Sequence, residues 1–309
     1  MFLINLMKGF IIGIAFIIPG VSGGTLAVYL GVYQKMLDSI GNIFKDFKNS
    51  FKFLLPIFLG IGISVVLLAK LFSVLLDWNS FIVLFFFIGL ILGGVKYIYK
   101  KTDSSKYSLG MILAFVISFL FLLVIIVLDK TNASNGIAYF DFNLGTYFLL
   151  MALGMIASIT MIVPGISGSA VLLVLGFYTA IVSNVIGNIL DFSEIVYNLQ
   201  VIIPFAFGAA IGIIIFSKVI SISLKKYPKE TYLAILGFVL ASVIGVFLEI
   251  KDQNTGATFA DQLPIYDFII NYLGDNVWSV IGGIFALSGG FFVSRYLIKF
   301  EGDVENENN

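Results

Sequence analysis

Two copies of one motif decide the fold: Pro19-Gly20-Val21-Ser22-Gly23-Gly24-Thr25 and, 145 positions later, Pro164-Gly165-Ile166-Ser167-Gly168-Ser169-Ala170. The match continues downstream, where Leu30-Gly31-Val32-Tyr33 corresponds to Leu175-Gly176-Phe177-Tyr178. Both copies lie between strongly apolar arms. A helix cannot continue through such a motif, because proline lacks an amide donor and glycine favours other backbone conformations. In a bilayer, such a break is tolerated only where protein or a water-filled cavity satisfies the freed backbone groups.

The composition is that of an integral membrane protein. Hydrophobic residues make up 60 % of the 309 residues and charged residues only 12 %, whereas about a quarter of a soluble domain is charged. The chain has no cysteine and no histidine, which excludes disulfides, thiolate or imidazole metal sites and histidine acid–base catalysis. No carboxylate falls in the middle of a predicted span, so a buried metal site or carboxylate proton relay is not expected. We expect no cofactor, no metal and no nucleic-acid partner.

The apolar runs divide into two similar halves. Runs long enough to span a bilayer follow the first motif at 53–76, 81–99 and 107–128, and the second at 200–222, 231–250 and 277–298. At an offset of 148, Pro56 and Gly60 match Pro204 and Gly208. The sequence therefore predicts an all-α integral membrane protein with repeats at 1–128 and 143–300, broken segments at 9–33 and 146–182, and a disordered acidic tail over 301–309.

The distribution of positive charge predicts the topology. If both broken segments are re-entrant hairpins, 15 Lys and Arg residues fall on one side and two, Lys130 and Lys251, on the other. If both segments crossed once, the split would be 8 to 9; if only the first crossed, it would be 14 to 3, which charge alone leaves open. Because matching sequences should fold alike, we expect two hairpins, with both termini cytoplasmic. Three spans per half then make the repeat inverted, as in many secondary transporters.

The hairpin tips are the candidate substrate site. Backbone amides there, the positive end of the restarting helix and the hydroxyls of Ser22, Thr25, Ser167 and Ser169 would form a nest for an anion. The alternative is a packing kink that lets helices approach closely. Lys70 and Lys218 occupy equivalent positions inside spans, where they would either bind a headgroup phosphate or extend to the membrane surface. No base adjoins the serines in sequence, so we expect a transporter and not an enzyme.

The motifs at Pro19–Thr25 with Gly31-Val32-Tyr33, and at Pro164–Ser169 with Gly176-Phe177-Tyr178, resemble those of polyprenyl-phosphate transporters of the PopT type. This bacterial and archaeal membrane family was formerly catalogued as a domain of unknown function, and the similarity covers about residues 5–300. The resemblance implies a flippase that returns undecaprenyl phosphate from the outer to the cytoplasmic leaflet of the cell membrane, where envelope polymer synthesis reuses it. By position, the substrate-handling residues would be Pro19, Gly20, Ser22, Gly23, Gly24, Thr25, Pro164, Gly165, Ser167, Gly168 and Ser169.

This chain departs from the family at one place. Many relatives carry an acidic residue shortly before the first motif, where this chain reads Ala15-Phe16-Ile17-Ile18. Coupling through that carboxylate is therefore not expected here, and a proton or a sodium ion stays open as the coupling ion.

Two other functions use the same features. A transporter or channel for a small anion would also use the tips, inside a closed central pore. A membrane-embedded lipid phosphatase would need a nucleophile and a base in contact. A laterally open groove would instead favour a polyprenyl-phosphate lipid, surrounded by bilayer lipids.

Overall fold

The computed structural model describes residues 2–17, 23–102, 107–131, 139–164, 171–172, 175, 177, 181, 185, 194–251, 258–259, 272, 274 and 276–307. Apart from an isolated bridge between Lys251 and Thr258, the regular structure of these residues is helical. The helices are α1 (Phe2–Ile17), α2 (Gly23–Tyr29), α3 (Tyr33–Gly41), α4 (Phe47–Lys101), α5 (Leu109–Thr131), α6 (Leu144–Ile162), α8 (Ile195–Lys226), α9 (Pro228–Leu248) and α11 (Val277–Glu307).

Several helices are long and apolar enough to cross a membrane. The stretches that meet this condition are Val74–Lys101, Leu109–Leu128, Ile195–Lys226, Pro228–Leu248 and Val277–Tyr296. By contrast, α1 has 16 residues and is roughly 24 Å long, which is less than the hydrocarbon thickness of about 30 Å. The chain is thus an all-α, multi-pass membrane protein.

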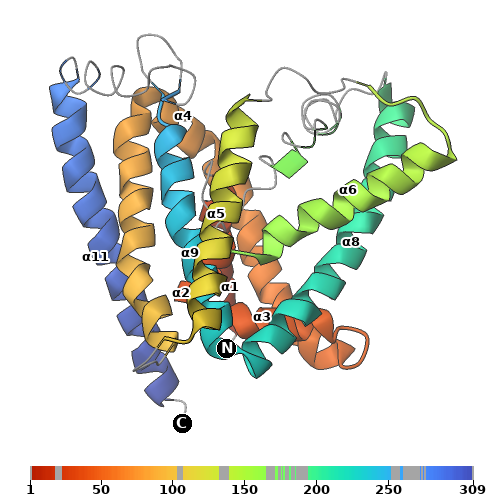
Figure 1. Cartoon of the computed structure of the whole chain (residues 1–309), viewed down its shortest axis with the longest axis horizontal. Helices are drawn as coiled ribbons and strands as arrows, with labels where there is room; N and C mark the ends of the chain where they lie inside the picture. The colour runs from red at the N-terminus through yellow and green to blue at the C-terminus, as the bar shows by residue number, and fades with distance from the viewer. Residues whose placement is uncertain are drawn as a thin grey trace.

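The predicted spans 53–76 and 81–99 are parts of one element, α4, which bends at Asn79. The backbone of Asn79 leaves the helical region (φ −161°, ψ 89°), and its side chain accepts a hydrogen bond of 3.0 Å from the amide of Ile82. This is the geometry of an N-cap, so Asn79 starts a new helix at the turn. The two parts of α4 form an inverted V in Figure 1.

The helices α8 and α9 form a V that opens the other way (Figure 1). They meet at Tyr227, which lies 148 residues after Asn79. Pro228 is the first residue of α9, where its fixed φ suits a helix start and its missing amide is not needed. The spacing of 148 residues that relates the two halves in sequence therefore also relates the two bends.

Close helix crossings repeat at the same spacing. A Cβ added to Gly9 of α1 would lie 2.1 Å from the carbonyl oxygen of Ile57 in α4, and one added to Gly60 would lie 2.1 Å from that of Leu6. In the second half, a Cβ added to Gly154 of α6 would lie 2.0 Å from the carbonyl oxygen of Phe205 in α8, and one added to Gly208 would lie 2.0 Å from that of Met151. Gly9 corresponds to Gly154 at an offset of 145, and Gly60 corresponds to Gly208 at an offset of 148. Only glycine allows backbones to approach so closely.

The two halves also pack against each other. In the first contact, α11 lies on the part of α4 after Asn79, where a Cβ on Gly290 would come within 2.0 Å of the Phe86 carbonyl oxygen. In the second, α9 lies on α5, where a Cβ on Gly237 would come within 2.5 Å of the Phe115 carbonyl oxygen. Both contacts therefore pair a helix of the second half with a helix of the first. In Figure 1, α1 begins and α11 ends at the same end of the bundle.

The C-terminal part differs from the prediction of a disordered tail over 301–309. The helix α11 continues from Val277 through Glu307. Extending an existing helix adds a hydrogen bond for each residue without a new nucleation step, and the tail contains no proline that would stop it.

Candidate substrate site at the meeting of the two motifs

The first motif copy enters the described structure at Gly23, where α2 begins. Gly23, Gly24 and Thr25 are buried, and only 1 % of the Thr25 surface is exposed. Pro19, Gly20 and Ser22 lie outside the described residues. Because α2 has only seven residues, its dipole is small, and binding of an anion would depend on individual amides and hydroxyls.

A Schellman turn ends α2. Gly31 has a φ of 67°, and the amides of Gly31 and Val32 donate to the carbonyls of Val28 and Ala27, each at 3.1 Å. These two bonds define a Schellman turn, in which glycine takes the left-handed backbone position. In the second half, the amide of Phe177 donates to the carbonyl of Leu172 at 2.8 Å, which repeats the bond from Val32 to Ala27 145 residues later.

The second motif copy begins where α6 ends. The helix stops at Ile162, and Val163 is extended (φ −79°, ψ 119°), as expected for a residue before proline. Pro164 is buried. Gly165, Ser167, Gly168 and Ser169 lie outside the described residues.

The structure brings the two copies together. A Cβ added to Gly24 would lie 3.3 Å from the carbonyl oxygen of Ile162 and 3.3 Å from Cα of Pro164. In addition, the hydroxyl of Tyr33 donates a hydrogen bond of 2.8 Å to the same carbonyl. Segments about 140 positions apart in sequence therefore meet at one point, with a buried threonine one residue from the contact.

A second tyrosine, Tyr29, ends α2 and packs against α4. The hydroxyl of Tyr29 donates a hydrogen bond of 2.7 Å to the carbonyl of Ile91 in α4. The Tyr29 ring lies against Gly94, where an added Cβ would come within 2.1 Å of Tyr29 Cζ. Neither Tyr29 nor Tyr33 is among the site residues predicted from sequence. The repeated motif nevertheless included Tyr33, and its recurrence as Tyr178 was the signal that could have pointed to it.

The two candidate lysines lie on α4 and α8. Lys70 belongs to α4, and its side chain is outside the described part of the structure. Lys218 is exposed on α8, and a Cβ on Gly41 of α3 would lie 3.2 Å from its Cα. The described neighbour of Lys218 is therefore α3 and not the motif contact.

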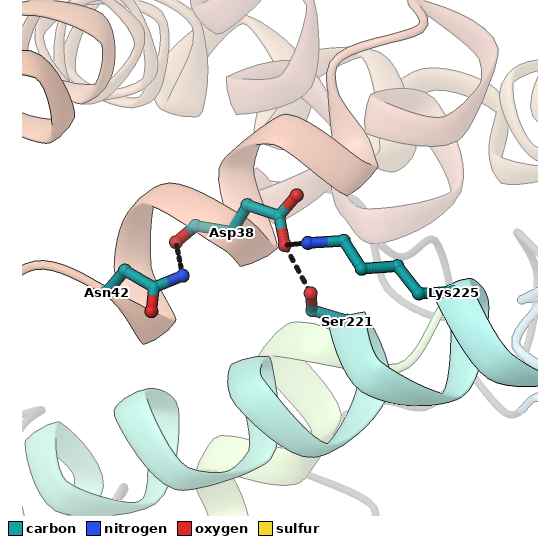
Figure 2. A network of polar contacts seen from close by, with 4 residues as sticks. All are labelled: Asp38, Asn42, Ser221 and Lys225. Carbon is teal, nitrogen blue, oxygen red and sulfur yellow. Dashed lines mark hydrogen bonds and ion pairs between the residues drawn. The ribbon is translucent and has the colours of Figure 1, made fainter.

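A polar cluster joins α3 to α8 near Lys218 (Figure 2). Lys225 Nζ lies 2.7 Å from Asp38 Oδ1, and the hydroxyl of Ser221 donates to the same oxygen. Asn42 donates 3.0 Å to the backbone carbonyl of Asp38. Lys218, Ser221 and Lys225 follow one face of α8, since they are three and four residues apart. Sequence reasoning missed this cluster because nothing in the pattern links residues 187 positions apart.

An apolar groove runs between α6 and α8. It has a volume of about 570 Å³ and is lined by Tyr147, Val196, Leu199, Gln200, Ile203, Pro204 and Phe207. The side chains of Val196, Ile203 and Phe207 are more than half exposed. The groove is therefore open to the surroundings. It lies beside the first turn of α6, and the opposite end of α6 leads to Pro164.

Comparison with known proteins agrees with these features. The family described as undecaprenyl phosphate translocase-like matches residues 12–260. The polyprenyl-phosphate transporter of Staphylococcus aureus (strain NCTC 8325 / PS 47) is 35 % identical over 256 residues, which cover 79 % of this chain and 86 % of that protein. The polyprenyl-phosphate transporter of Vibrio cholerae serotype O1 is 31 % identical over 256 residues, which cover 78 % and 76 %.

No solved structure matches the chain. The match to the family covers most of the sequence, and it includes the first motif copy and the second. The chain belongs to the undecaprenyl phosphate translocase-like family.

Proposed function

We propose that this protein transports undecaprenyl phosphate across the membrane and binds its phosphate where the two Pro-Gly-x-Ser-Gly motifs meet. The observation that carries the proposal is the contact of Gly24 with Ile162 and Pro164. Packing kinks that served only their own halves would not require the two motif copies to meet. Family membership supports the lipid as substrate, because both relatives are named polyprenyl-phosphate transporters.

The chemistry of the motif suits this substrate. Taking an unpaired phosphate charge out of water costs many kcal/mol, so polar groups must replace its hydration shell. The candidates are the tip amides with the hydroxyls of Ser22, Thr25, Ser167 and Ser169. The glycines of the motif, Gly20, Gly23, Gly24, Gly165 and Gly168, would let the backbone approach the headgroup closely.

We further propose that the chain is an inverted repeat in which each half has one re-entrant hairpin and three spans. Several observations support this arrangement. The bends at Asn79 and Tyr227 are 148 residues apart and open in opposite directions (Figure 1). The glycine crossings and the turn after α2 recur at offsets of 145 and 148. The length of α1, which is below the bilayer thickness, is also what a hairpin arm requires.

The proposed direction of transport is from the outer to the cytoplasmic leaflet of the cell membrane. Transport in this direction returns the carrier lipid to the leaflet where envelope polymer synthesis reuses it. Both termini would be cytoplasmic by the positive-inside rule. The common end of α1 and α11 in Figure 1 supports an even number of crossings. Lys70 and Lys218, which are equivalent in the repeat, would each attract the phosphate toward one leaflet, with a proton or a sodium ion as the coupling ion.

The open groove between α6 and α8 favours a lipid over a small inorganic anion. An isoprenoid chain can remain in contact with apolar surface while the phosphate crosses, and the groove offers such a surface beside α6. A small anion would have no use for it.

The test uses purified protein in liposomes that contain labelled undecaprenyl phosphate. Protein-containing liposomes should exchange the lipid between leaflets faster than liposomes containing an unrelated membrane protein. Exchange of a labelled phospholipid and uptake of inorganic phosphate serve as controls. Unchanged exchange of undecaprenyl phosphate with folded protein would contradict the proposal, and uptake of inorganic phosphate instead would favour the small-anion alternative.

A further inference from the structure

We infer that Tyr33 is a positioning residue of the phosphate site, whose hydroxyl holds the second motif in place against the first. The inference rests on the function proposed above and assigns a role to a residue outside the motif. Tyr33 is buried, with 6 % of its surface exposed. It begins α3, directly after the turn at Gly31.

The hydrogen bond of Tyr33 reaches a carbonyl at the end of a helix. Its hydroxyl lies 2.8 Å from the oxygen of Ile162, the last residue of α6 and two positions before Pro164. Within a helix, this carbonyl would accept from the amide four residues later, but α6 ends and Val163 is extended. An unsatisfied carbonyl in the bilayer interior costs several kcal/mol. Tyr33 supplies a hydrogen-bond donor to this carbonyl, where α6 ends.

The same carbonyl touches the first motif. An added Cβ at Gly24 would lie 3.3 Å from the Ile162 oxygen as well as from Pro164. One oxygen atom thus contacts both the first motif copy and Tyr33. If the hydroxyl were lost, the last turn of α6 could shift to find another donor, and Pro164 would move with it. A displacement of about 1 Å is enough to impair a positioned site.

Tyr29 provides a matched control. It is also buried, four residues earlier, and its hydroxyl also donates to a backbone carbonyl, that of Ile91, at 2.7 Å. That carbonyl belongs to α4 and not to a motif copy. Tyr29→Phe and Tyr33→Phe therefore remove the same chemical group in similar surroundings, but only Tyr33→Phe frees the second motif.

The first experiment measures exchange of undecaprenyl phosphate in liposomes against lipid concentration for both variants. Tyr33→Phe should raise the half-saturating lipid concentration by roughly three- to tenfold, the range expected for one lost hydrogen bond. Tyr29→Phe should leave it within about twofold of the wild type, with a similar fall in thermal stability for both variants. An unchanged half-saturating concentration in Tyr33→Phe, or an equal rise in both variants, would overturn the inference. Absence of exchange by the wild type would instead contradict the proposed function.

A second experiment does not depend on transport. The chain contains no cysteine, so a Gly24→Cys, Pro164→Cys pair reports directly on the distance between the motif copies. Oxidation should join this pair several times more slowly in the Tyr33→Phe background than in the Tyr29→Phe background. Equal rates in the two backgrounds would show that Tyr33 does not position the second motif.

Discussion

Lys225 Nζ lies 2.7 Å from Asp38 Oδ1, and this ion pair joins α3 of the first half to α8 of the second. The side chain of Asp38 is 31 % exposed and that of Lys225 54 %, so the pair is partly screened by solvent. The hydroxyl of Ser221 shares the same carboxylate oxygen. The contact therefore combines a modest ion pair with a hydrogen bond donated by a buried serine.

The ion pair should contribute a small, measurable stability. Exposed pairs contribute about 0.2–1 kcal/mol, so Asp38→Asn and Lys225→Gln should each lower the thermal midpoint slightly, and the double variant should lose less than the sum. The effect should shrink at high salt, because screening weakens exposed pairs. Lys226→Gln, which removes the neighbouring charge on the same helix, is the control. Strictly additive losses in a double-mutant cycle would show that the two charges do not interact.

The glycine crossings should be essential for the packed bundle. Gly60→Ala and Gly208→Ala each place a Cβ about 2 Å from a carbonyl oxygen of the neighbouring helix, and such overpacking typically costs about 1–3 kcal/mol. Gly62→Ala is the matched control on α4, because no described atom lies within 4 Å of its added Cβ. Thermal unfolding in detergent should rank Gly62→Ala near or above the wild type and the other two well below. Equal stability of all three variants would contradict the close crossings.

The serines of the motifs should affect transport more than stability. A hydrogen bond to a charged group contributes roughly 1.5–3 kcal/mol, so Ser22→Ala and Ser167→Ala should each slow undecaprenyl phosphate exchange by about tenfold or more. Gly23→Leu and Gly168→Leu should abolish exchange in a protein that still inserts and folds, since a side chain would fill the nest. Normal exchange in both serine variants, together with unfolded glycine variants, would favour packing kinks.

Labelling of single cysteines tests the topology. A reagent that cannot cross the membrane should reach cysteines at 191–194 and 252–262 from outside intact cells, but not those at 45–52 or 225–229. The wild type is a suitable background because it has no cysteine. Permeabilised cells provide the control for reactivity at the inner positions. Labelling of position 48 from outside would contradict a re-entrant first hairpin.

Much of the fold could be predicted because hydropathy and repetition are strong signals. The runs at 107–128, 200–222, 231–250 and 277–298 overlap α5, α8, α9 and α11, although α8 begins five residues before its run and α11 ends nine residues after its own. The gap between the first two predicted spans, 77–80, includes Asn79, where α4 bends. Its cap was not predicted, because it depends on one side chain, Asn79, folding back on Ile82.

The contacts of the site were harder to predict. The repeat identified Gly24 and Pro164 as members of the two motif copies, but not that they would meet. That contact depends on how the two halves pack, which hydropathy does not encode. The bond of Tyr33 to Ile162 and the pair of Asp38 with Lys225 likewise join distant segments through one or two atoms. Such contacts follow from the assembled bundle and leave no periodic trace in sequence.

The central claim is that the two motif copies meet and bind the phosphate between them, and a disulfide across them tests it most directly. Gly24→Cys and Pro164→Cys should form a disulfide on oxidation. An added Cβ at position 24 lies 3.3 Å from Pro164 Cα, so one further bond of about 1.5 Å keeps the two Cβ atoms near the 3.5–4.5 Å separation that a disulfide needs. Each single cysteine variant, treated with the same oxidant, is the control.

Undecaprenyl phosphate exchange is compared between the dithiol and disulfide forms of the same double variant: the exchange that the dithiol form retains should be lost when the disulfide forms and should return on reduction. The account would be contradicted if the pair failed to form a disulfide in folded protein. It would also be contradicted if the cross-linked protein exchanged the lipid as fast as the dithiol form does.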